Sequence, residues 1–129
     1  MKIYLDSAII IYLIEDIIPY SDKIKNRLSN TGIELFASEL SRLECRMHPI
    51  KTNNLELLQD YDLYFQSNIF DVLQLSRNVM EKATEIRAKY SFKTPDAIHL
   101  AISVINNCEI FLTNDLELKK FSEISIETL

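Results

Sequence analysis

Short apolar runs alternate with longer stretches of helical periodicity along this chain, and this alternation is the feature that most restricts its fold. The apolar runs predict four strands at Lys2–Leu5, Glu34–Ala37, Ile69–Leu73 and Glu109–Thr113, and a candidate edge strand at Ile124–Ile126. Parallel strands need long crossover connections, which helices supply and tight turns cannot. We therefore predict an α/β fold in which a parallel sheet carries helices on both faces.

The helices are predicted from apolar residues that recur at three- and four-residue intervals between the strands. They cover Ala8–Ile17, Pro19–Leu28, a stretch that begins near Ser38 or Ser41, Asn53–Phe65, Val79–Tyr90, Pro95–Ile105 and Asp115–Lys120. We expect the third of these helices to end before Pro49 and to turn Leu40, Leu43 and Met47 inward. Ser7 and Thr94 are the expected N-caps of the first and sixth helices.

Composition excludes several classes of protein. The chain of 129 residues has a single glycine, Gly32, whereas phosphate-binding loops of the dinucleotide and Walker types need at least two close together. Cys45 and Cys108 stand apart from any C-x-x-C pair, and we expect two buried thiols rather than a disulfide. The length predicts a single domain over residues 1–129. No apolar stretch is long enough for a membrane span, so we expect a cytoplasmic protein without membrane contact.

The charge balance restricts the mode of nucleic-acid binding. With 19 acids and 14 bases, the net charge of −5 argues against a generally basic binding surface. It leaves room for a nuclease, because the metal ligands of such an enzyme are themselves acids.

Four carboxylates are expected near the carboxyl edge of the sheet, where open α/β folds place their active crevice. Asp6 and Asp115 follow the first and fourth strands, Asp96 opens a largely apolar helix, and Glu44 lies on the helix after the second strand. Carboxylates gathered there repel one another unless a cation neutralises them. Oxygen ligands of this kind suit Mg²⁺ or Mn²⁺.

Each of these acids also has a structural explanation. Asp6 and Asp115 could simply cap the helices that follow them, and Asp96 could interact with its helix dipole. Glu44 could pair with Arg42, Arg46 or His48 on a solvated face. Spacing alone therefore leaves the metal cluster and the helix caps as open alternatives.

Four segments, taken in order, favour the metal cluster: KIYLDS at residues 2–7, SELSRLE at 38–44, KTPDAIHLA at 93–101 and FLTND at 111–115. The chain resembles the PIN domain family, and within it the small VapC-type toxins. This resemblance implies a three-layer α/β/α sandwich with a central parallel sheet of four to five strands. It also implies a metal-dependent endoribonuclease, the toxin of a type II toxin-antitoxin system, using Mg²⁺ or Mn²⁺.

The resemblance also implies roles for individual residues. The four acids match Asp6, Glu44, Asp96 and Asp115, and the small hydroxyl positions beside them match Ser7 and Thr113. A cognate antitoxin and a homodimer are the implied protein partners, beside the RNA substrate. Family members commonly carry Asn where this chain has Ala8, which removes one polar group that could brace the acids.

Local positive charge must hold the RNA, and we assign this role to Arg42, Arg46 and Lys93. His99 lies on an apolar helix, so we interpret it as a packed, hydrogen-bonded core histidine.

Two further functions compete with the toxin. One is a PIN-fold module that binds RNA or protein without cleaving, which Ala8 favours. The other is a haloacid dehalogenase-type phosphatase, which Ala8 disfavours because that chemistry needs a second Asp there.

Overall fold

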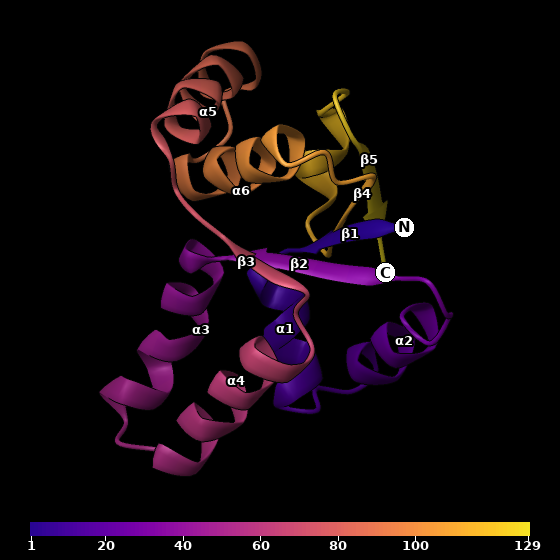
Figure 1. Ribbon diagram of the computed structural model, residues 1–129, viewed down its shortest axis with the longest axis vertical. Coiled ribbons are helices and arrows are strands. Elements are labelled where there is room, and N and C mark those ends of the chain that lie inside the picture. Colours follow the sequence, from indigo (N-terminus) through magenta and orange to yellow (C-terminus); the bar gives the residue numbers. More distant parts are fainter.

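The computed structural model describes residues 1–129 and consists of a five-stranded parallel sheet between two layers of helices (Figure 1). The strands lie in the order β3-β2-β1-β4-β5, and every neighbouring pair is parallel. Their bounds are β1 (Lys2–Leu5), β2 (Glu34–Ser38), β3 (Asp71–Leu73), β4 (Ile110–Thr113) and β5 (Ser125–Thr128). The predicted three-layer α/β/α architecture is confirmed.

The helices divide between the two faces of the sheet. They are α1 (Ser7–Ile14), α2 (Tyr20–Arg27), α3 (Glu39–Lys51), α4 (Leu55–Ser67), α5 (Arg77–Tyr90), α6 (Thr94–Ile105) and the short 3₁₀ helix η1 (Leu116–Lys120). Figure 1 shows α1 to α4 below the sheet and α5 and α6 above it. No helix is long and apolar enough to span a bilayer.

Strand β1 contributes side chains to the hydrophobic core on both faces of the sheet, because successive side chains of a strand point to opposite faces. Ile3 and Leu5 pack in the cluster beneath the sheet, with residues of α1 to α4. Tyr4 packs in the cluster above it, with residues of α5 and α6. All three side chains are fully buried. A register slip of one residue would exchange the two faces, so burial on both sides fixes the strand.

The strand order creates a switch point between β1 and β4. From β1 the chain continues to β2 on one side, while from β4 it continues to β5 on the other. In the β1–β4 register Leu5 lies opposite Leu112, so Asp6 emerges beside Thr113. Open α/β sheets bind ligands in the crevice at such a point.

The prediction for the inner face of α3 is wrong. Leu43 and Met47 are 63% and 56% exposed, and the buried side chains are Ser41, Cys45 and Pro49. Small residues let α3 approach the sheet and its neighbours closely, which the apolar pattern alone does not reveal. The expected end before Pro49 is also wrong, because α3 continues to Lys51. A proline so near the end removes a single intrahelical hydrogen bond, and its ring is buried.

Two of the predicted N-caps, Ser7 and Thr94, are also wrong, because in each case the residue before is the N-cap. Asp6, not Ser7, is the N-cap of α1, because it directly precedes the first helical residue and its carboxylate accepts from the Ser7 N–H. Thr94 is already the first residue of α6, and Lys93 at the N-cap makes no side-chain bond. The cap of α3 is confirmed: Ser38 accepts from the Ser41 N–H, and the Ser41 hydroxyl accepts from the Ser38 N–H. Cys45 and Cys108 are free and buried, as expected.

Candidate functional site

Asp6 stands at the carboxyl end of β1, where two hydrogen bonds fix its carboxylate. Oδ1 accepts the Ser7 N–H at 2.9 Å, and Oδ2 accepts the Thr113 hydroxyl at 2.7 Å. The first bond begins α1, and the second crosses to the end of β4. Since Thr113 is fully buried, bulk water does not compete for its hydroxyl, and the fold sets the direction of the carboxylate.

Asp115 is held by the same threonine. Its backbone N–H donates to Thr113 Oγ1 at 3.1 Å, and its own Oδ1 accepts the Glu117 N–H at 3.0 Å to cap η1. Thr113 therefore bridges the two acids that follow the adjacent strands β1 and β4. Asp115 is exposed, whereas Asp6 is half-buried.

Asp96 approaches these two acids from the first turn of α6, where it is the third helical residue. Burial raises the pKa of the Asp96 carboxyl, and the negative charges of Asp6 and Asp115 raise it further. Smaller opposing effects come from His99 and Lys93. Asp6 and Asp115 are thus near enough to Asp96 for their charges to act on it, although the three come from separate parts of the chain.

Glu44 lies beside this group and is connected to it through Ser7. The Ser7 hydroxyl donates to Glu44 Oε1 at 2.7 Å, and His99 Nε2 lies 2.6 Å from the same oxygen. Burial alone would raise the pKa of Glu44, but the hydrogen bonds from His99 and Ser7 outweigh burial and hold that pKa below its usual value. Glu44 is therefore an ionised carboxylate at the margin of the site.

The acids as they stand do not yet form a coordination sphere: no three Asp, Glu, His or Cys side chains enclose a position for a metal ion. Their chemistry nevertheless fits a hard divalent cation, because all the donors are carboxylate or hydroxyl oxygens. The pKa of Asp96 is raised mainly by burial and further by the negative charges of Asp6 and Asp115. A divalent cation would remove that repulsion and draw the carboxylates inward.

His99 is packed and hydrogen-bonded, as predicted, but its partners connect it to the site. It is 2% exposed, and its Nδ1 lies 2.7 Å from the Tyr4 hydroxyl. Tyr4 also donates to Ser38 Oγ at 2.9 Å. Sequence reasoning missed Tyr4 and the His99–Glu44 contact. The available signals were a phenol within an apolar strand and a histidine one helical turn after Asp96.

The three basic residues assigned to RNA occupy different environments. Arg42 pairs with Glu39 at 3.1 Å, and Arg46 pairs with Asp62 of α4 at 2.8 Å. Both are partly buried and engaged within the protein. Lys93 is exposed, makes no ion pair and directly precedes α6, near Asp96.

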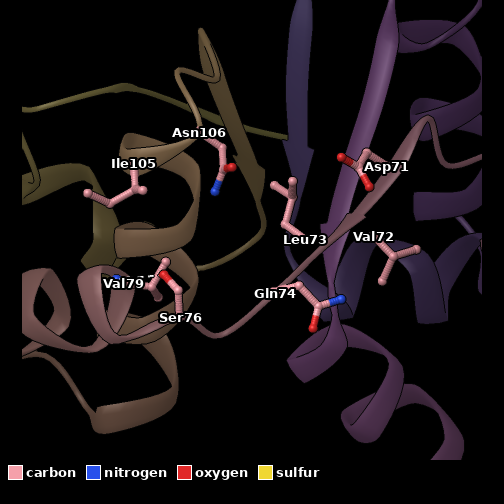
Figure 2. A pocket seen from close by; sticks show the side chains of 8 residues that line it. All are labelled: Asp71, Val72, Leu73, Gln74, Ser76, Val79, Ile105 and Asn106. Atoms are coloured by element: carbon pink, nitrogen blue, oxygen red, sulfur yellow. Dashed lines mark hydrogen bonds between the residues drawn. The ribbon is translucent and has the colours of Figure 1, made fainter.

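A separate cavity of about 330 Å³ lies beside the edge strand β3 (Figure 2). Figure 2 shows Leu73 and Gln74 on one side of it and Val79 and Ile105 on the other. Asp71 is its single ionisable lining residue. One isolated carboxylate offers little chemistry, so the candidate site remains the carboxyl edge of β1 and β4.

Comparison with known families gives a match that spans most of the chain. A family model for the PIN domain matches residues 3–124. The chain belongs to the PIN domain family. A search of curated protein sequences found no match.

Solved structures with the PIN fold resemble this one over nearly their whole length. VapBC2 from Rickettsia felis, bound to a DNA fragment from its promoter, has a TM-score of 0.78 at 17% identity and covers 99% of this chain and 98% of its own. A toxin-antitoxin complex from Klebsiella pneumoniae has a TM-score of 0.74 at 18% identity, and the match covers 94% of this chain and 93% of the other. VapC20 from Mycobacterium tuberculosis, a toxin that cleaves the sarcin-ricin loop, has a TM-score of 0.74 at 13% identity. The match covers 95% of this chain and 98% of VapC20. At these identities the likeness establishes the shared fold.

Proposed function

We propose that this protein is a metal-dependent endoribonuclease that acts as the toxin of a type II toxin-antitoxin system. The observation that carries the proposal is the approach of Asp6, Asp96 and Asp115 at the switch point of a PIN fold. The sarcin-ricin loop toxin and the toxin-antitoxin complex, which share this fold, supply the biological class.

The proposed chemistry is hydrolysis of an RNA phosphodiester. A bound Mg²⁺ or Mn²⁺ would acidify the attacking water and offset the charge on the phosphate. Asp6, Asp96 and Asp115 would hold the ion through their carboxylate oxygens, with Glu44 as a further ligand. Glu44, which is ionised, would orient the attacking water and accept its proton. Ser7 and Thr113 would keep the carboxylates in place through the bonds described above.

Lys93 is the basic residue best placed to contact an RNA phosphate, because it is exposed and precedes the helix that carries Asp96. Arg42 and Arg46 would contribute only by leaving their carboxylate partners Glu39 and Asp62. We therefore expect Lys93 to contribute more to substrate affinity than either arginine.

The proposed partners are a cognate antitoxin and a second copy of the chain, acting in the cytoplasm. Apolar side chains available for such contacts lie on the outer faces of α3 and α4, where Leu43, Met47, Leu55 and Leu63 are all more than half exposed. The inner faces of α1 and α4 are committed to the core, so they offer no contact area.

The competing function is a PIN-fold module that binds RNA or protein without cleaving. Ala8 is the observation in its favour, since an apolar methyl follows Ser7 where a polar side chain could have braced the acids. The Asp6 carboxylate is held without such a side chain, because the Ser7 N–H and the Thr113 hydroxyl each donate to one of its oxygens.

RNA cleavage by the purified protein tests the proposal. We expect cleavage with Mg²⁺ or Mn²⁺, none with EDTA, and a loss of about 100-fold or more in Asp6→Asn and Asp96→Asn. Asp60→Asn is the matched control, because Asp60 is exposed on α4 and makes no side-chain bond. Cleavage that survives EDTA or both site variants would contradict the assignment. A tightly bound RNA or protein that is never cleaved would favour the binding module.

A further inference from the structure

A chain of buried polar side chains runs from β1 through α6 to α3. Tyr4 is fully buried and His99 is 2% exposed, yet each has a polar atom within hydrogen-bond distance of the other at 2.7 Å. His99 then reaches Glu44 Oε1 through Nε2 at 2.6 Å. These contacts therefore join strand β1, which Asp6 directly follows, to α3, the helix that carries Glu44.

The bonds to Glu44 are unequally divided between its two oxygens. Oε1 receives both His99 Nε2 and the Ser7 hydroxyl, whereas Oε2 has no hydrogen-bond partner within the protein. One oxygen is thus anchored to the interior while the other is free for water or an ion. A glutamate side chain without such an anchor would sample several rotamers, and fixing it in advance removes that cost from binding and reaction.

At the other end of this series of hydrogen bonds, the Tyr4 hydroxyl also has defined partners. The Tyr4 hydroxyl bonds Ser38 Oγ at 2.9 Å and lies 3.5 Å from Ser41 Oγ. These two serines form the cap of α3, the helix on which Glu44 is carried. His99 consequently contacts Glu44 directly and also, through Tyr4, the N-terminal turn of the same helix.

We propose that His99 is a positioning residue for Glu44, and that Tyr4 orients the His99 ring for this task. Through Nε2 the imidazole holds Glu44 Oε1 and leaves Oε2 facing the candidate site, while the bond at Nδ1 prevents rotation of the ring. This inference rests on the proposed function, because the role of Glu44 in metal-dependent hydrolysis is part of that proposal. Histidine and carboxylate partners that orient a ligand in this way typically change metal affinity or activity by about 10–100-fold when removed.

Four variants and a control test the proposal. His99→Leu removes both bonds, His99→Gln restores a donor toward Glu44, and Tyr4→Phe removes only the hydroxyl. The fourth variant combines His99→Leu with Glu44→Gln. Tyr64→Phe is the control, because Tyr64 is a buried core tyrosine whose hydroxyl takes no part in the Tyr4–His99–Glu44 hydrogen bonds. Each protein is measured for urea unfolding, for Mn²⁺ affinity by calorimetry and for kcat and KM on RNA.

We expect His99→Leu to lower kcat and Mn²⁺ affinity by about tenfold or more with little change in KM, and His99→Gln to recover most of the loss. Tyr4→Phe should show a smaller loss of the same kind, and Tyr64→Phe none. In the Glu44→Gln background, His99→Leu should cause no further loss of kcat, because its effect acts through Glu44. A purely structural histidine would instead lower stability in both backgrounds and leave the kcat of the folded protein unchanged.

Two failures remain distinguishable. A folded His99→Leu variant with the wild-type Mn²⁺ affinity and kcat would overturn the positioning role. If that variant does not fold, a folded Tyr4→Phe variant with the wild-type Mn²⁺ affinity and kcat would overturn it. If the wild-type protein binds Mn²⁺ but cleaves no RNA, the proposed function fails, and the difference in Mn²⁺ affinity between wild type and His99→Leu or Tyr4→Phe still decides the positioning role.

Discussion

Thr113→Val tests how far one buried hydroxyl organises the candidate site. Thr113 is fully buried at the end of β4, where its hydroxyl donates to Asp6 Oδ2 at 2.7 Å and accepts the Asp115 N–H at 3.1 Å. Valine keeps the β-branched shape and the strand preference of threonine. The substitution therefore removes two hydrogen bonds with little change in packing volume.

The expected loss follows from those two bonds. A hydrogen bond to a charged acceptor contributes about 1.5–3 kcal/mol, and the half-buried Asp6 carboxylate retains its other bond, to the Ser7 N–H. The Asp115 N–H belongs to an exposed residue, so water replaces most of its bond. The added buried methyl returns up to about 0.8 kcal/mol. We expect a net loss of about 1.5 kcal/mol in the free energy of unfolding, or a fall of about 6 °C in Tm.

Urea unfolding in EDTA, followed by far-UV circular dichroism, measures this loss without any contribution from metal. The matched control is Thr84→Val on α5, whose hydroxyl donates to the Met80 carbonyl on the exposed surface. The control should change stability by no more than about 0.5 kcal/mol. Thr113→Val should also weaken Mn²⁺ binding, because both Asp6 and Asp115 lose their shared anchor.

A Thr113→Val protein within about 0.5 kcal/mol of wild type would refute this reasoning. It would show that water or a neighbouring donor replaces the threonine hydroxyl at no cost. A loss of stability with unchanged Mn²⁺ affinity would refute the second half, since the bridge would then support the strand ends without organising the acids.

Three further predictions follow from the site and its surroundings. Asp96→Asn should make the metal-free protein more stable at pH 7, because burial and the charges of Asp6 and Asp115 raise the pKa of Asp96 in the folded state. The wild type should recover that difference as the pH falls through the raised pKa toward the unperturbed value of about 3.9, and saturating Mg²⁺ should reverse the order of stability, both measured by urea titration. Cys45 should react slowly with a thiol reagent at pH 8 until urea is added, because burial raises the pKa of its thiol to about 12. Ser38→Ala should cost about 1–2 kcal/mol of unfolding free energy by calorimetry, because it removes the cap of α3 and a partner of Tyr4.

The parts of the fold that the sequence predicts correctly are those controlled by local pattern. The apolar run at Lys2–Leu5 specifies a buried strand, and the acid after it necessarily emerges at the carboxyl edge of the sheet. Asp6 and Asp115 fall at this edge for the same reason, and the structure places both beside Thr113.

The parts that the sequence does not predict depend on contacts between distant segments. On α3 the apolar stripe through Leu43 and Met47 is exposed, and the smaller Ser41 and Cys45 face the interior. Which face turns inward depends on how closely the helix approaches its neighbours, and no periodicity within one helix contains that information. The contact between His99 and Glu44 spans 55 positions in the chain, so only the assembled fold brings it about.

The helix-cap and metal-ligand roles, which remain alternatives at the level of sequence, are compatible in the structure. Asp6 caps α1 with Oδ1 and accepts Thr113 with Oδ2, but each oxygen of an ionised carboxylate has two acceptor directions. Each oxygen therefore keeps one direction free for an ion. Asp115 caps η1 with Oδ1 alone and keeps Oδ2 without a partner. The backbone N–H groups that these acids cap also orient them, so capping contributes to the preorganisation of the carboxylates and does not compete with their proposed role as ligands.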